Sequence, residues 1–130
     1  MRRVDEIWDR DGGRCVWCSR EAWPRDRTVE HLLPRSRGGR DATHNLLPAC
    51  KACNRARRSQ PAVAYARRRA ADGAAVMADV LVRGLERLAA AGTADERRYG
   101  AKQARLVREW QASERALAAH VARSGGATRA

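Results

Sequence analysis

The sequence has few of the residues from which large hydrophobic cores are built. It contains no Phe and a single Ile, and only 19 of its 130 residues are Leu, Ile, Val or Phe. Alanine supplies 26 residues of the 44% hydrophobic fraction. So small a set of large apolar side chains excludes a large β-sandwich or a doubly wound α/β domain. A stable fold of this sequence needs a cross-link such as a disulfide or a bound metal ion (a staple), long Ala-rich helices, or both.

Long apolar segments are also absent. No run approaches the roughly 20 apolar residues that a membrane span needs. The N-terminal residues, MRRVDEIWDR, lack the apolar stretch of a secretory signal. We therefore expect a cytoplasmic protein with no membrane partner.

Lysine is nearly missing, whereas arginine is abundant. Lys51 and Lys102 are the only lysines among 27 basic residues, and 15 acidic residues leave a formal net charge of +12. A charge of this size concentrates polyanions, and the planar guanidinium group suits phosphate. Nucleic acid is the expected partner, and an anionic membrane surface is a less favoured alternative.

Composition divides the chain near residue 60. All four cysteines lie in residues 1–60, whereas 21 of the 26 alanines lie in residues 61–130. In the first part, the spacing of Val4, Ile7 and Trp8 predicts a short amphipathic helix. The pattern then predicts a strand at 28–32, a basic loop at 35–43, an extended segment at 45–49 and a helix from about residue 51.

The second part is helical by composition and period. One apolar stripe from Met77 to Leu88 predicts a helix that ends at Gly92. The segment from Thr93 to Glu96 matches a capping box, which begins the last helix. The expected second part is therefore an all-helical extension.

The last helix carries a seam with coiled-coil spacing. Its members recur in steps of four and three: Tyr99, Gln103, Leu106, Trp110, Ser113, Leu117 and His120. Because two helices of this chain can pair with each other, we favour that pairing over dimerisation. A homodimer or a larger complex through these helices stays open. We expect a disordered tail over about residues 124–130.

The four cysteines form two Cys-x-x-Cys pairs, Cys15/Cys18 and Cys50/Cys53, with 31 residues between the pairs. Thiolates at this spacing can meet at a tetrahedral zinc ion, and two pairs close a structural site. A disulfide framework is disfavoured inside the cell, and a redox pair lacks its usual βαβ context. Zinc would supply the missing staple, because metal binding drives the folding of such domains. The core around it is expected to hold three tryptophans: Trp8, Trp17 and Trp23.

The segment between the cysteine pairs carries polar residues in a specific order. Glu30 and His31 stand on the first predicted strand, Asn45 begins the second, and Asn54 follows Cys53. Together with both cysteine pairs and the loop sequence LLPRSRGG, this order resembles the HNH endonuclease family in its zinc-bearing ββα-metal form. The resemblance spans about residues 2–58. It implies an α+β fold class, with a zinc-stapled ββα-metal domain over 1–60 and the helical extension over 61–130.

The resemblance also implies a mechanism. His31 matches the general base that takes a proton from water, and Asn45 matches the residue that braces the loop and helps to orient the His. Glu30 and Asn54 match the ligands of one divalent ion, and their oxygen donors suit Mg²⁺ or Mn²⁺. The implied products carry 5′-phosphate and 3′-hydroxyl ends. Since one site cuts one strand, a monomer is expected to nick duplex DNA, with RNA left open as a substrate.

Five arginines are the predicted phosphate contacts of this site. Arg57 and Arg58 lie three and four residues after Asn54, and so share its helix face. The other three belong to the Gly-rich loop: Arg35, Arg37 and Arg40.

Two other functions stay open from the sequence. One is a non-catalytic, zinc-dependent DNA-binding or adaptor protein that reuses the fold. The other is a nuclease subunit of a larger phage packaging or restriction/defence machine. All three predict salt-sensitive DNA binding, but only a nuclease loses cleavage when His31 is replaced by Ala.

Overall fold

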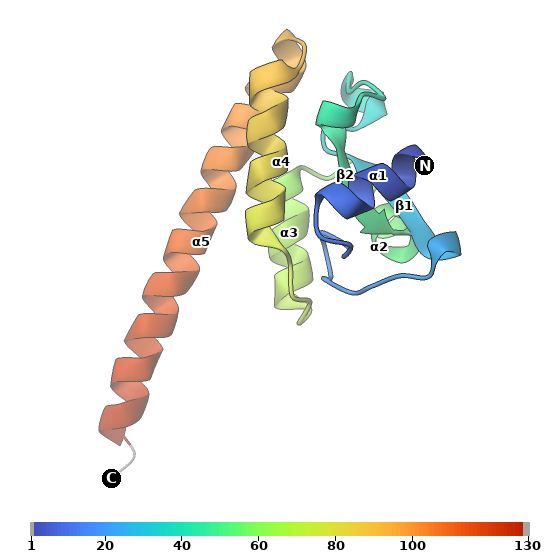
Figure 1. Cartoon of the computed structure of the whole chain (residues 1–130). Coiled ribbons are helices and arrows are strands. Elements are labelled where there is room, and N and C mark those ends of the chain that lie inside the picture. The colour runs from blue at the N-terminus through green and yellow to red at the C-terminus, as the bar shows by residue number, and fades with distance from the viewer. Residues whose placement is uncertain (1, 129–130) are drawn as a thin grey trace.

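A two-stranded antiparallel sheet with helices around it gives the chain an α+β fold, as predicted (Figure 1). The computed structural model describes residues 2–128. The first part contains α1 (Arg3–Arg10), β1 (Arg27–His31), β2 (Leu46–Cys50) and α2 (Lys51–Arg57). The second part contains α3 (Ala62–Ala71), α4 (Ala78–Ala91) and α5 (Ala94–Thr128). No helix among the described residues is both long and apolar enough to cross a membrane.

Helix α1 is amphipathic and lies against the sheet. Ile7 and Trp8 are its buried residues, as the spacing predicts. The Trp8 indole Nε1 donates a hydrogen bond to the carbonyl oxygen of Thr28 at 2.8 Å. This bond satisfies the indole N–H that burial would otherwise leave unpaired, and it fixes α1 against β1.

The two strands pair in a register that places the predicted site residues at one end of the sheet. Glu30 lies opposite Leu47, and His31 lies opposite Leu46. Asn45 directly precedes β2, next to Leu46, which pairs with His31. Side chains alternate between the faces of a strand, which separates the Glu30 side chain from that of His31.

Helix α4 packs closely onto β2, and α5 packs closely onto α4, because glycines stand at the contacts. A Cβ atom on Gly84 of α4 would lie 2.7 Å from a methyl carbon of Leu47 on β2. A Cβ atom on Gly100 of α5 would lie 2.6 Å from the carbonyl oxygen of Leu85 on α4. The predicted pairing of two helices within the chain is confirmed, and their directions are opposite (Figure 1).

One hydrophobic core runs across the predicted boundary near residue 60. Trp17 and Leu47 of the first part belong to the same buried cluster as Leu81 and Val107 of the second. The division into 1–60 and 61–130 stays a prediction, but the helices of the second part are joined to the sheet by this shared core.

The second half of α5 extends past its neighbours (Figure 1). In the first half of α5, residues of the predicted seam face the core: the Gln103 side chain is buried, and Trp110 packs at the edge of the core. Leu117 and Val121 are exposed by 57% and 56%. Helix α5 continues to Thr128 and so overlaps the segment for which a disordered tail is predicted. Residues 129–130 lie outside the described residues.

Candidate active site and metal centre

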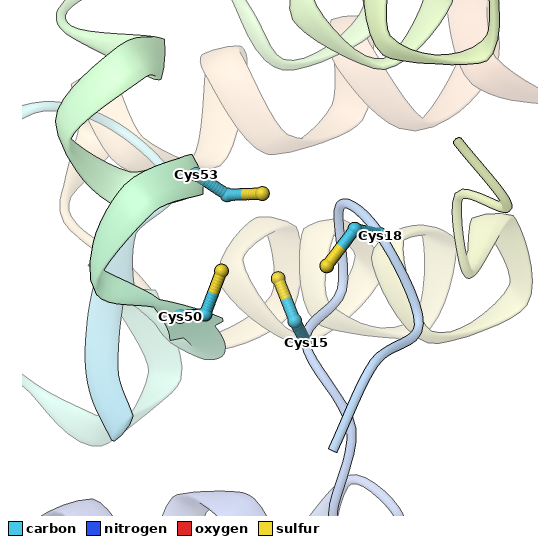
Figure 2. Close-up of side chains that lie close together, drawn as sticks. All are labelled: Cys15, Cys18, Cys50 and Cys53. Carbon is cyan, nitrogen blue, oxygen red and sulfur yellow. The ribbon is translucent and has the colours of Figure 1, made fainter. Parts of the chain in front are cut away.

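The four cysteines converge on one point, as Figure 2 shows. Cys15 and Cys18 come from the loop after α1, Cys50 ends β2, and Cys53 lies on α2. Their Sγ atoms all lie within 4.8 Å of one another. A tetrahedral zinc ion with Zn–S bonds of about 2.3 Å needs sulfurs about 3.8 Å apart. Four converging sulfurs with this spacing fit zinc, and they belong to the two pairs that the sequence predicts.

In the absence of a metal ion, the surroundings of the cluster favour the protonated thiols of Cys15 and Cys50. The side-chain hydrogen bond with Cys53 and burial raise the pKa of the Cys15 thiol, and burial raises the pKa of Cys50. A zinc ion reverses this effect, because a coordinating thiol is deprotonated outright. The Nη2 atom of Arg69 lies 3.9 Å from Cys53 Sγ, where it can offset thiolate charge.

His31 ends β1 and contacts a carboxylate that the sequence did not single out. Its Nε2 atom lies 3.0 Å from Asp41 Oδ1. Arg3 of α1 donates to both Asp41 carboxylate oxygens, at 3.0 and 3.1 Å, and to the Asp41 carbonyl oxygen at 3.1 Å. The hydrogen bond with His31, followed by that with Arg3, lowers the pKa of Asp41. The His31 side chain is 21% exposed and so remains accessible to water.

Asn45 is fully buried and ties the two ends of the loop that precedes it. Its Nδ2 donates to the carbonyl oxygens of Leu33 and Arg40, each at 3.0 Å, and its Oδ1 accepts from the Leu33 N–H at 2.9 Å. A Cβ atom on Gly39 would lie 1.7 Å from the Leu33 carbonyl oxygen, so only glycine fits there. These bonds hold the segment from Leu33 to Arg40 beside the His31 strand.

Glu30 points into the core rather than toward His31. Its Oε2 accepts from the Trp17 indole N–H at 2.9 Å, and its Oε1 accepts from Arg57 Nη1 at 3.0 Å. The residue is 4% exposed. Burial raises the pKa of Glu30, while the charge of Arg57 and the hydrogen bond from Trp17 act in the opposite direction.

Arg57 is fully buried, which corrects its predicted role as a phosphate contact. Its guanidinium group also donates to the carbonyl oxygens of His31 and Leu32, each at 2.6 Å, and to the Tyr99 hydroxyl at 3.0 Å. Helical periodicity places Arg57 near the face of α2 that carries Asn54. It does not predict which part of that face is covered by other elements of the fold. The Glu30 charge and the carbonyl groups at the end of β1 account for its inward orientation.

Asn54 lies on α2 beside β1. Its Nδ2 donates to Thr28 Oγ1 at 2.9 Å and to the Val29 carbonyl oxygen at 3.0 Å, which leaves Oδ1 without a partner among the described residues. Glu30, its predicted partner in a divalent-ion site, has a donor on each oxygen and a guanidinium cation beside it. In this arrangement the Glu30–Asn54 pair does not fit a second metal ion.

The remaining predicted arginines differ in their surroundings. Arg35, Arg37 and Arg58 are exposed, and their side chains make no ion pair or hydrogen bond within residues 2–128. Arg40 is half exposed, and its backbone N–H and Nε donate to Glu96 at 2.9 and 3.1 Å. The Arg40 backbone N–H and Nε therefore already donate hydrogen bonds within the molecule.

Glu96 joins α5 to the loop of the candidate site. It accepts from the Thr93 N–H at 2.8 Å, as the predicted capping box requires, and it contacts His44 Nε2 at 3.3 Å. Burial acts to raise the pKa of Glu96, but the hydrogen bonds from Thr93, Arg40 and His44 lower it to about 2. The second part of the chain thus holds the loop of the first through a carboxylate that stays ionised at neutral pH.

Comparison with protein families finds a match over the segment that contains these residues. Residues 15–61 match a family model described as HNH endonuclease. The matched segment contains both cysteine pairs, His31, Asp41, Asn45 and Asn54. No curated protein and no solved structure matches the chain.

Proposed function

We propose, from the match of residues 15–61 to the HNH endonuclease family model, that the chain is a metal-dependent endonuclease that hydrolyses DNA phosphodiester bonds. In this proposal residues 1–60 carry the chemistry, and residues 61–130 support them from behind β2. The observation that carries it is the partly exposed His31 imidazole at 3.0 Å from the Asp41 carboxylate. An imidazole held by a carboxylate is the usual arrangement of a general base.

The proposed reaction begins with proton transfer from water to His31. Asp41 accepts a hydrogen bond from Nε2–H, so Nδ1 is the ring nitrogen left to take the proton. The hydroxide attacks phosphorus, the bond from phosphorus to the 3′ oxygen breaks, and that oxygen takes up a proton. The products carry 5′-phosphate and 3′-hydroxyl ends. The negative charge of Asp41 stabilises the imidazolium that forms.

The resemblance to HNH endonucleases implies a catalytic divalent ion, and we predict that this ion is Mg²⁺ or Mn²⁺. In such an enzyme the ion supplies charge stabilisation for the phosphate and the departing oxygen. Because Glu30 is engaged by Arg57 and Trp17, we assign no step to an ion held by Glu30 and Asn54. Asn54 Oδ1 is the predicted ligand atom that remains open.

The test is cleavage of supercoiled plasmid by the wild type and by His31→Ala, with Mg²⁺, with Mn²⁺ and with a chelator, while protein-bound zinc is monitored. We expect metal-dependent nicked circles from the wild type. Loss of a general base costs about 10²- to 10⁴-fold in rate, so His31→Ala should give almost none. His120→Ala, which changes an exposed histidine on α5, should cut at the wild-type rate.

Equal cleavage by the wild type and His31→Ala would reject His31 as the base. If neither protein cuts and both bind DNA, the alternative of a non-catalytic binding protein or a partner-dependent subunit replaces the proposal. One His31 per monomer predicts that nicked circles accumulate before linear DNA.

Asp41→Asn tests the orientation of His31. Asn removes the negative charge and can present its NH₂ group to the ring, so kcat should fall about 10- to 100-fold, the range known for groups that orient a metal-ligating His. KM should change little, because Asp41 acts through His31. Asp9→Asn on α1, an exposed carboxylate without an ion pair inside residues 2–128, is the matched control. An unchanged kcat in Asp41→Asn would remove Asp41 from the mechanism.

A further inference from the structure

A groove of about 1170 Å³ lies beside the zinc-site cysteines. Its walls come from three segments: residues 20–27, residues 50–56 from the end of β2 through most of α2, and residues 65–72 from α3 and the residue that follows it. Arg27 lines the groove at one end of β1, and His31 ends the same strand. Four residues of strand span about 13 Å. The groove is therefore adjacent to the candidate active site but does not include it.

Cations dominate the lining of this groove. It contains six basic side chains: Arg20, Arg27, Lys51, Arg55, Arg68 and Arg69. The three acidic residues of the lining each lie within 4.0 Å of an arginine: Glu21 of Arg14, Asp26 of Arg25, and Asp72 of Arg69.

Four of the groove cations have no protein partner. The side chains of Arg20, Lys51, Arg55 and Arg68 are exposed and make no ion pair or hydrogen bond within the described residues. A zinc ion with four thiolates carries a net charge of −2, but these cysteines are mostly buried and Arg69 lies against Cys53. The outer rim of the groove therefore keeps a positive potential that suits the phosphates of a nucleic-acid strand.

Trp23 stands at the rim of the groove and is 72% exposed. This corrects the prediction that Trp23 packs around the zinc: Trp8 and Trp17 are fully buried, and they fill that core. Pro24 follows Trp23 and begins a short 3-10 turn, Pro24–Asp26, whose Asp26 N–H donates to the Trp23 carbonyl oxygen at 2.8 Å. The backbone that presents the indole to solvent is thus held in place.

We propose that this groove binds an unpaired strand of the nucleic-acid substrate, with a base stacked on Trp23 and phosphates on Arg20, Lys51, Arg55 and Arg68. The inference rests on the proposed function for the identity of the ligand. An exposed aromatic ring beside unpaired cations is the combination that binds single strands. Duplex DNA satisfies the cations equally well, but its bases are already stacked on each other, so Trp23 selects the unpaired strand.

Binding is tested in the full-length, zinc-loaded His31→Ala protein, with fluorescein-labelled oligothymidylate as the probe. Replacing Trp23 by Ala in this background should weaken binding about 5- to 150-fold, the effect of losing one stacked base. Trp23→Phe keeps an aromatic face and should retain most of the affinity. Leu117→Ala, which removes an exposed apolar side chain from α5, should have no effect. Zinc content and thermal unfolding should match in all variants.

A duplex probe separates stacking from charge. Trp23→Ala should bind duplex DNA as the parent protein does, whereas Lys51→Gln and Arg55→Gln should weaken binding to both probes. Each lost phosphate contact lowers the salt dependence of single-strand binding by about 0.7 in the slope of log K against log salt. Arg123→Gln at the far part of α5 is the charge-matched control and should leave this slope unchanged.

Wild-type affinity of Trp23→Ala for oligothymidylate would overturn the groove assignment, as would equal losses on both probes. Because the binding protein already lacks His31, these results do not depend on cleavage. If the wild type cleaves plasmid and the Trp23→Ala variant binds oligothymidylate normally, the proposed function stands and the groove assignment is rejected. If the wild type does not cleave plasmid but binding depends on Trp23, the groove assignment stands and the proposed function is rejected.

Discussion

Disruption of the cysteine cluster is expected to unfold the chain. Cys50→Ser removes one of the four converging sulfurs and should abolish stoichiometric zinc binding. Structural zinc contributes about 10–16 kcal/mol of apparent binding free energy in zinc-finger peptides, which exceeds or matches the total stability of about 5–15 kcal/mol of a typical domain. Circular dichroism during thermal unfolding, with zinc content measured on the same sample, gives the readout.

The expected loss extends to the helices of the second part. Leu47 packs under Gly84 of α4, and the buried cluster that includes Cys53 continues to Val107 of α5. Because α3 and α4 share this buried cluster with the sheet, we expect the two parts to unfold in one cooperative transition. Cys50→His is the matched control, because three cysteines and one histidine are a common zinc set. It should restore zinc binding and most of the unfolding temperature.

Chelation of the wild type in the presence of a reductant makes the same test without a mutation. The helical signal should fall as zinc leaves and should return when zinc is added back. A chelated, reduced protein that keeps its unfolding temperature would contradict a structural role for the cysteine cluster. The reductant prevents disulfides from replacing the metal as a staple.

The features that the sequence predicted are those that depend on short spacings. Two Cys-x-x-Cys pairs, the Thr93–Glu96 capping box and the apolar stripe that ends at Leu88 are all local patterns, and each has the structure that its spacing indicates. The two strands were placed within about one residue of their observed bounds. Local geometry decides these elements, so a single sequence is sufficient for them.

The contacts that the sequence could not predict join residues far apart in the chain. Asp41 meets Arg3 across 38 residues, and Glu96 meets Arg40 across 56. A charged side chain in an Arg-rich sequence has many possible partners, and no periodicity selects among them. Trp23 was assigned to the core by residue type, yet its exposure depends on whether the core already has enough aromatic volume.

Replacement of Arg57 by Ala is expected to destabilise the protein strongly. The guanidinium group is the only cation within 4.0 Å of the Glu30 carboxylate in the described residues, and both side chains are buried. Breaking a buried ion pair by removing one partner costs about 3–5 kcal/mol, because the remaining charge is uncompensated. The loss of bonds to the carbonyl oxygens of His31 and Leu32 adds to this cost. Urea unfolding at neutral pH gives the free energy.

The pH dependence of this destabilisation identifies the Glu30 charge as its cause. Burial already raises the pKa of Glu30, and loss of Arg57 removes the nearby charge that opposes this effect. With a folded-state pKa above the unfolded value of about 4.3, Glu30 favours folding in its protonated form. The stability of Arg57→Ala should therefore decrease as pH rises through that folded-state pKa. Arg58→Ala, the exposed neighbour, should stay within about 0.5 kcal/mol of the wild type throughout.

Glu30→Gln in the Arg57→Ala background completes the argument, because it removes the stranded charge and keeps the side-chain volume. It should recover part of the lost stability and abolish its pH dependence. The single variant Glu30→Gln separates the two roles considered for Glu30. If the carboxylate serves only the ion pair with Arg57, unfolding free energy falls while kcat per folded molecule is retained. If it also binds the divalent ion, kcat falls and the metal concentration needed for half-maximal cleavage rises, in a protein that is still folded.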